Sequence, residues 1–379
     1  MDRRQRRIAA AAVLAAVVAA CSAPAPTAHL RGFHNGASGD DGGVVFGEDP
    51  SGVVGAACAK TTAAASHSPV YMLVVLDGSG SMSQDNKWYA VVPALQAFFD
   101  DLARHYDPSF GVGLTVFSDT LDATSGMGPY GKADVPIRVV DATQAAALVA
   151  RLTGAPNGLT PTFAVMSGQY PLLDSFEPVA PLEAGGKRVL VLMTDGVPNA
   201  GAPEQEQCVA LAATERTKST LTFAVGIGNL GQYDPANYDP VFMANLAVAG
   251  GAPNAGCVPG EKTDAARMCH FQVTPGGRSA QEIERDFLGA IDRIRGEALS
   301  CDFRLPPRTD DVDPQKVNVV FTSGAGKDVL LPQNATDGWT FDDAASPTSV
   351  LLHGAACTAA KSDPRGKVSI VMGCKTVVR

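Results

Sequence analysis

The sequence lacks the short motifs that mark several common classes of enzyme. Its 379 residues contain no Gly-x-Ser-x-Gly element of a serine hydrolase and no His-Glu-x-x-His element of a zinc peptidase. They also contain no Cys-x-x-Cys pair and no Cys/His cluster at the spacing of zinc ligands. Any chemistry of this chain must therefore depend on other side chains.

Positive charge is also scarce. Lys and Arg number 30 against 39 Asp and Glu, which gives a formal net charge of −9. Four of the arginines stand within the first seven residues, so the remainder of the chain is more acidic still. An acidic chain without a basic stripe argues against nucleic acid and against flat anionic membrane surfaces as partners. It is compatible with cation binding.

The N-terminus has the pattern of an export signal. A basic start is followed by an apolar run, Ile8 to Ala20, that is too short to span a bilayer comfortably. The next residues resemble a bacterial lipobox, which predicts removal of residues 1–20 and lipidation of Cys21; the alternative is an ordinary cleaved signal. Ser22 would favour the outer membrane of a Gram-negative cell. We therefore expect an exported protein anchored by lipid in the cell envelope.

Residues 21–68 are rich in Ala, Gly, Ser, Thr and Pro. Such a composition cannot bury enough apolar surface to fold. We expect this stretch to be a flexible tether between the anchor and the first folded domain.

The most informative segment combines a strand with a turn rich in oxygen ligands. The continuous apolar run from Tyr71 to Leu76 predicts a parallel strand buried on both faces. In the Asp-Gly-Ser-Gly-Ser turn that follows, the glycines allow Asp77, Ser79 and Ser81 to direct their oxygens at one point. Hard oxygen ligands suit Mg²⁺, Mn²⁺ or Ca²⁺. The alternative is a simple turn in which Ser81 caps the next helix.

Two later segments strengthen the metal-site interpretation. A second buried-strand pattern, Lys187 to Thr194, ends directly before Asp195. Between the two strands, a Gly/Pro loop places Thr160 just before a helical stretch. Ligands of open α/β sheets bind beyond the carboxyl ends of the strands, where connections diverge. All three loops are therefore expected at one edge of the sheet.

With these residues the chain resembles the von Willebrand factor type A (VWA) domain family. The metal-ion-dependent adhesion site of that family combines Asp-x-Ser-x-Ser with a distant Thr and an Asp after a buried strand. The resemblance covers about residues 70–298 and assigns the metal site to Asp77, Ser79, Ser81, Thr160 and Asp195. It implies that the three hydroxyls contact the metal directly, and that the two carboxylates act through water or as switchable ligands.

The remaining patterns predict the rest of the architecture. Strands and helices alternate over residues 69–299, which indicates a doubly wound, mostly parallel sheet with helices on both faces. From residue 300 to 379 the pattern changes to short strands and turns, typical of a small antiparallel sandwich or partial barrel. Strands of this β-rich module are expected at residues 316–321, 328–331, 339–341, 349–352 and 367–372.

Seven cysteines follow Cys21, and export would permit them to form disulfides. We expect Cys257 to pair with Cys269 across a Pro/Gly loop. We expect Cys58–Cys301 to join the two ends of the α/β domain and Cys357–Cys374 to cross-link the C-terminal module. Because the count is odd, one thiol is left over, and we expect it to be Cys208.

One further motif is weak evidence. Gly226, Gly228 and Gly231 fit the dinucleotide-binding fingerprint and follow a predicted strand. However, Tyr233-Asp-Pro235 stands where that fingerprint needs a helix to hold the pyrophosphate. We interpret these glycines as part of a loop and expect no nucleotide.

The function expected from these observations is metal-dependent protein binding, in adhesion or in assembly of a complex, without catalysis. A partner's Asp or Glu carboxylate would complete the coordination of Mg²⁺, as the VWA resemblance implies. One alternative is a Mg²⁺-dependent hydrolase, for which Asp119 is the candidate general base. The other is a structural protein that docks without metal.

Overall fold

The computed structural model describes the following residues: 61–65, 69–118, 130–195, 197–230, 238–275, 278–298, 301–305, 316–363 and 366–372. The predicted export signal, Cys21, Cys58, Asp119 and Cys374 lie outside these ranges, so the expectations for the signal, for Cys21 and for Asp119 stay predictions. Within the described ranges, no helix combines the length and the apolar character needed to cross a membrane.

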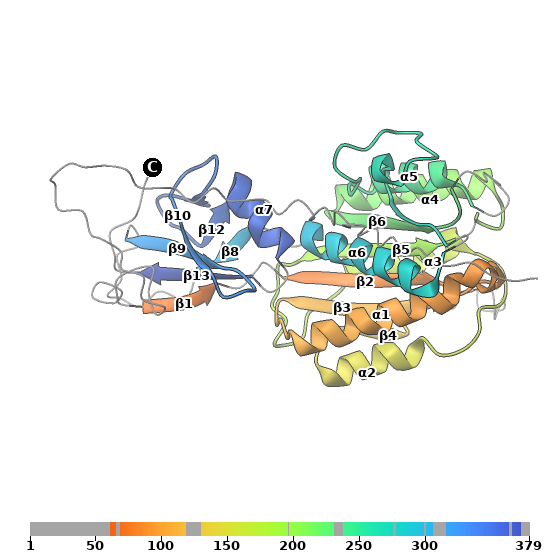
Figure 1. Ribbon diagram of the computed structural model, residues 1–379, viewed down its shortest axis with the longest axis horizontal. Coiled ribbons are helices and arrows are strands. Elements are labelled where there is room, and N and C mark those ends of the chain that lie inside the picture. The colour runs from red at the N-terminus through yellow and green to blue at the C-terminus, as the bar shows by residue number, and fades with distance from the viewer. Residues whose placement is uncertain are drawn as a thin grey trace, which may run out of the picture. The chain divides into compact units, whose positions relative to one another are not determined.

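A six-stranded sheet forms the core of the first folded part of the chain (Figure 1). All neighbouring strands run parallel except the edge strand β4, which pairs antiparallel with β3. In spatial order the strands are β4 (Val135–Val139), β3 (Phe110–Phe117), β2 (Val70–Asp77), β5 (Lys187–Thr194), β6 (Thr220–Ile227) and β7 (Phe271–Val273). The mostly parallel sheet expected from the sequence is confirmed.

Helices cover both faces of this sheet (Figure 1). On one face lie α1 (Lys87–Arg104), α2 (Ala142–Arg151) and α6 (Ala280–Ala298). On the other face lie α3 (Thr162–Asp174), α4 (Ala202–Thr217) and α5 (Pro240–Ala249). Two short 3₁₀ helices, η1 (Gly80–Asn86) and η2 (Ala265–Arg267), occur in the connections. The doubly wound architecture is therefore also confirmed.

The central strand β2 shows why the sequence folds this way. All eight of its residues are buried. Alternate side chains enter different cores: Met72 and Val74 pack with α1 and α6, whereas Leu73 and Val75 pack with α3 and α5. Because both faces of this parallel strand are covered, the side chains on both faces must be apolar, and the strand appears in the sequence as a continuous apolar run. Removal of this apolar area from water is the main force holding the sheet and helices together.

Helix α5 was not expected from the sequence. Its side chains are apolar on almost every side, so the sequence carries no helical periodicity that would set it apart from a buried strand. Its start is fixed locally, because the Asp239 carboxylate accepts hydrogen bonds from the backbone N–H groups of Val241 and Phe242, at 2.9 and 3.2 Å.

The C-terminal module consists of two antiparallel sheets around a separate apolar core that includes Trp339 and Ile370. The larger sheet has the order β1 (Thr61–Ala65), β13 (Lys367–Met372), β9 (Val317–Thr322) and β10 (Asp328–Leu331). The smaller sheet has the order β11 (Trp339–Phe341), β12 (Ser349–Leu352) and β8 (Asp302–Arg304). The five predicted strands are present, and β1 and β8 are additional.

Strand β1 corrects the prediction of a tether over residues 21–68. It pairs antiparallel with β13 along its whole length, from Thr61 opposite Met372 to Ala65 opposite Val368. The Thr-Thr-Ala-Ala-Ala sequence has little apolar bulk, so the strand depends on its hydrogen-bonding partner rather than on its own pattern. The module therefore uses chain from both sides of the α/β domain.

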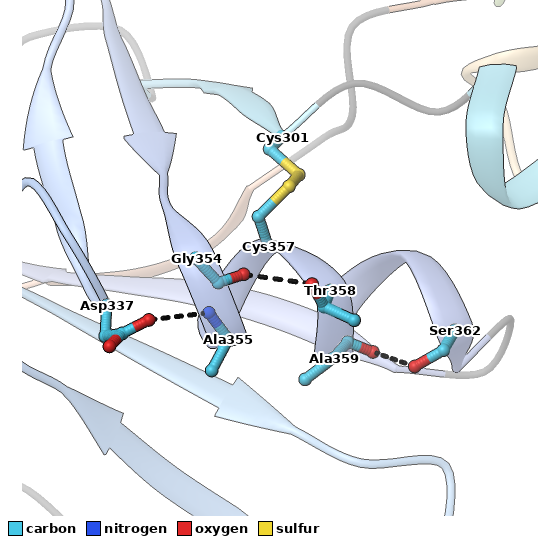
Figure 2. Close-up of a disulfide and its surroundings, with 8 residues drawn as sticks. All are labelled: Cys301, Asp337, Gly354, Ala355, Cys357, Thr358, Ala359 and Ser362. Carbon is cyan, nitrogen blue, oxygen red and sulfur yellow. Dashed lines mark hydrogen bonds between the residues drawn. A yellow bond between two sulfur atoms is a disulfide. The ribbon is translucent and has the colours of Figure 1, made fainter. Parts of the chain in front are cut away.

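The disulfides agree with the sequence analysis in one case and differ in another. Cys257 bonds to Cys269, the pair expected from the loop between them. Cys301 bonds to Cys357, as Figure 2 shows, so the expected pairs Cys58–Cys301 and Cys357–Cys374 are both wrong. Among the described cysteines, Cys208 is the free one, and burial raises the pKa of its thiol to about 12.

An unexpected helix explains the second disulfide. Helix α7 (Gly354–Ser362) carries Cys357 and brings its Cα within 5.5 Å of the Cα of Cys301. The Asp337 carboxylate accepts a hydrogen bond from the N–H of Ala355 at 3.0 Å and thereby satisfies a donor in the first turn (Figure 2). The sequence analysis placed only turns here, and without this helix the distance between the two cysteines could not be judged.

Candidate metal centre

The two candidate carboxylates lie next to each other because their strands are neighbours. β2 and β5 pair in parallel, with Leu76 opposite Met193, and β2 ends at Asp77 while β5 ends one residue before Asp195. The next strand along the chain, β3, lies on the other side of β2. The carboxyl end of β2 is thus a point where connections diverge to opposite sides, the usual place for a ligand in an open α/β sheet.

Backbone hydrogen bonds join the predicted ligand loops. The N–H of Gly80 donates to the carbonyl of Gly158 at 2.9 Å, and the N–H of Asn157 donates to the carbonyl of Gly78 at 2.8 Å. The N–H of Thr160 donates to the side-chain oxygen of Asn199 at 2.7 Å, which ties this loop to the segment after β5. Three distant parts of the sequence therefore form one surface.

The side chains of this surface form one hydrogen-bonded network. The Oγ atoms of Ser79 and Ser81 are 3.0 Å apart, and the Ser81 hydroxyl donates to Oδ1 of Asp195 at 2.8 Å. Oδ1 of Asp77 accepts from the N–H of Ser79 at 2.8 Å, and Oδ2 accepts from the Thr194 hydroxyl at 2.5 Å. Four of the five predicted ligands are thus directly linked, and the backbone contacts described above join the loop of the fifth, Thr160, to the Asp77 loop.

Burial raises the free energy of the charged form of both carboxylates. Both Asp77 and Asp195 have no solvent-exposed area. Burial, together with the nearby Asp195 charge, raises the pKa of Asp77 to about 7. Burial also raises the pKa of Asp195, while Lys87 favours its charged form. Two buried carboxylates need positive charge close by to stay ionised.

Lys87, which was not expected from the sequence, supplies part of that charge. This first residue of α1 is 4% exposed, and its Nζ lies 2.6 Å from Oδ2 of Asp195. The only available signal was its position, six residues after Ser81 at the start of the predicted helix. Thr194 and Asn199 were likewise not expected to hold the site, although both lie within four residues of Asp195.

The donor set fits a hard divalent cation. It consists of hydroxyl and carboxylate oxygens, which are hard ligands. No group of three or more His, Cys, Asp or Glu able to hold a metal occurs among the described residues, so this set depends on its hydroxyls. Two buried carboxylates against the single ammonium of Lys87 leave an excess of negative charge. A divalent cation beside Ser79 and Ser81 would neutralise that excess.

The rim of the site offers surface for a partner. Leu159, directly before Thr160, is 57% exposed and presents an apolar side chain next to the site. A pocket of about 260 Å³ opens beside the Asp77 loop, and its lining includes Gly78, Trp88, Arg151 and Asn157. An incoming chain that reached the metal could therefore also bury apolar and polar groups next to it.

Two glycines of the apparent dinucleotide fingerprint, Gly226 and Gly228, have a packing role. A Cβ atom on Gly226 or Gly228 would overlap the side chain of Tyr238. The Tyr238 hydroxyl hydrogen-bonds His270 Nε2 at 2.8 Å and also contacts Gln272, so the ring is fixed in place. Burial lowers the pKa of His270 to about 4, which keeps this cluster neutral at pH 7.

Comparison with known proteins agrees with this description. The family model of the von Willebrand factor type A domain matches residues 72–239, which hold all five predicted ligands. No curated protein matches the chain. Together with the fold and the site, the family match shows that this chain contains a VWA domain.

Several solved structures are similar to this chain at low sequence identity. The pilus adhesin SpaC from Lactobacillus rhamnosus GG is 15% identical, with a TM-score of 0.44 over 80% of this chain and 38% of its own. Proximal thread matrix protein 1 from the mussel byssus is 17% identical, with a TM-score of 0.39 over 61% of this chain and 49% of its own. Manganese-loaded TRAP protein from Plasmodium vivax is 19% identical, with a TM-score of 0.35 over 60% of this chain and 76% of its own. The chain thus spans well under half of the adhesin.

Proposed function

We propose that the VWA domain binds a protein partner through a divalent cation held by Asp77, Ser79, Ser81, Thr160 and Asp195. The observation that carries this proposal is the hydrogen-bonded network of hydroxyls and buried carboxylates at the carboxyl edge of the sheet. Mg²⁺ is the first candidate and Mn²⁺ the second, because both prefer oxygen ligands in octahedral geometry and keep open positions for water or a ligand.

Each residue has a distinct task in this proposal. The hydroxyls of Ser79, Ser81 and Thr160 are neutral ligands, so they leave most of the cation's charge available. That charge attracts an external carboxylate, and an exposed Asp or Glu of the partner would complete the coordination. The buried carboxylates of Asp77 and Asp195 hold the hydroxyl-bearing loops in place and balance the charge of the ion.

The site favours binding over catalysis. A hydrolase would need a general base beside a metal-bound water. The candidate base, Asp119, lies outside the described residues. The carboxylate oxygens of Asp77 and Asp195 accept hydrogen bonds from loop residues and from Lys87. Metal-dependent hydrolysis of a phosphate ester or a peptide that is lost in both Asp119→Ala and Asp195→Ala would contradict a binding role.

Partner capture should depend on the metal and on the apolar rim. We expect immobilised full-length protein to retain a partner from envelope extract in Mg²⁺ or Mn²⁺ and to release it in EDTA. Leu159→Ser should weaken retention about tenfold, because a buried leucine contributes roughly 1.5–3 kcal/mol. Dissociation rates on the captured complex, with the partner identified by mass spectrometry, provide the measurement.

A matched control is Val179→Ser. Val179 is 70% exposed but lies between the end of α3 and the start of β5, at the opposite edge of the sheet from the metal centre. It should leave retention unchanged. Binding that survives EDTA would instead support docking without metal, and equal effects of the two substitutions would remove the rim from the interface.

We further propose that a lipid on Cys21 anchors the protein in the cell envelope. The support is the lipobox-like Val18-Ala19-Ala20-Cys21 sequence after a basic, apolar leader. Cys21→Ser should move the protein from the membrane fraction to the soluble fraction or leave its leader uncleaved. Mass spectrometry should find diacylglycerol on the wild-type N-terminus; a mature N-terminus elsewhere, without lipid, would refute the anchor.

A further inference from the structure

A lysine is buried in the middle of the metal centre. Lys87 is 4% exposed, its Nζ lies 2.6 Å from Oδ2 of Asp195, and it reaches the carbonyl of Ser81 at 3.5 Å. A lysine is almost never this buried unless it is paired, and here its partner is one of the predicted metal ligands. The ammonium group therefore lies against the same carboxylate that a divalent cation would use.

The oxygens of both carboxylates already have partners. In Asp195, Oδ1 accepts from Ser81 and Oδ2 accepts from Lys87. In Asp77, Oδ1 accepts from the N–H of Ser79 and Oδ2 from Thr194. Of these four partners, Lys87 is the only one that carries a charge, so it alone repels an incoming cation.

We propose that Lys87 is a resident counter-ion of the metal centre that holds Asp195 in place and limits the affinity of the site for divalent cations. This inference rests on the proposed metal-binding function. When both carboxylates are ionised, they and the ammonium of Lys87 carry one net negative charge; without Lys87 the carboxylates carry two. Like charges a few ångströms apart in a partly buried site repel strongly, so removal of the ammonium should strengthen metal binding.

A purely structural ion pair makes a different prediction. It would lower stability when broken, because Asp195 would be left as an unpaired buried charge, but it would not make the metal bind more tightly. A counter-ion predicts both effects: lower stability without metal and tighter binding of the metal. Metal affinity therefore separates the two interpretations.

The test is calorimetric titration of the full-length protein with Mn²⁺. Lys87→Met, which keeps much of the side chain's length, should bind Mn²⁺ at least about tenfold more tightly than wild type. Its thermal midpoint should fall in EDTA and recover in Mn²⁺. Lys87→Arg keeps the charge and should not gain affinity. Lys218→Met is the matched control. The half-exposed Lys218 pairs at 2.8 Å with Asp174 and with the buried Glu215, near the end of α4 and away from the metal centre.

Each outcome has one meaning. Equal or weaker Mn²⁺ binding by Lys87→Met, with wild type binding normally, overturns the counter-ion proposal. Absence of Mn²⁺ binding by wild type overturns the proposed metal-dependent function instead. If Lys87→Met folds only with metal, chelator competition against the Mn²⁺-loaded protein gives the same comparison, and release as easy as from wild type again contradicts the proposal.

Discussion

Asp77→Ala should lower the affinity for Mn²⁺ or Mg²⁺ by at least about 100-fold, in line with the loss caused by removing a metal ligand or its immediate support. Asp77 carries one of the two buried negative charges of the site, and its carboxylate fixes both the Ser79 backbone and the end of β5 through Thr194. Calorimetric titration measures the loss, and far-ultraviolet circular dichroism should remain native.

Two other variants serve as comparisons for Asp77→Ala. Thr160→Ala should cause a smaller loss, because the loop backbone stays tied to Asn199. Asp100→Ala removes an exposed carboxylate from the surface of α1 and should leave the affinity unchanged. Wild-type affinity in a folded Asp77→Ala protein would remove Asp77 from the metal centre, and with it the assignment of the whole site.

Gly228→Ala should lower the free energy of unfolding by about 3 kcal/mol, near the upper end of the usual cost of overpacking. The added methyl group would overlap the Tyr238 ring, and the ring cannot move freely because its hydroxyl is bonded within the buried cluster of His270 and Gln272. Urea denaturation, monitored in EDTA and again in Mn²⁺, measures the change.

The matched control is Gly131→Ala. A Cβ atom at Gly131 would have no heavy atom within 4 Å, so this variant should stay within about 1 kcal/mol of wild type. Native stability of Gly228→Ala would show that Tyr238 does not require the glycine. The glycine pattern after β6 would then need another explanation.

The elements predicted correctly from the sequence are those whose apolar residues follow the spacing of a buried strand or helix face. β5, β10, β11, β12 and β13 have the bounds that were expected, because short apolar runs between turn residues define both ends. The predicted ligand loops could be identified because each follows or precedes an element that the apolar pattern marks. The hydrogen bonds between these loops could not be predicted, because they join residues far apart in the sequence.

The features that were missed depend on contacts between distant residues. Strand β1 has no pattern of its own and exists through pairing with β13. The Cys301–Cys357 bond depends on α7, whose alanine-rich sequence gave no clear period. No local pattern marks Lys87 as buried, and its ion pair with Asp195 joins residues 108 positions apart in the sequence.

The pairing of β1 with β13 sets an order of assembly during synthesis. Residues 61–65 leave the ribosome early, yet their hydrogen-bonding partner is made only after the entire α/β domain and β9. All strands of the α/β domain come from one continuous stretch of the sequence, so this domain can fold before β1 has a strand to pair with. A chain released before residue 367 would carry a finished metal centre and an incomplete sheet with unpaired edges, the kind of surface that promotes aggregation and attracts proteases.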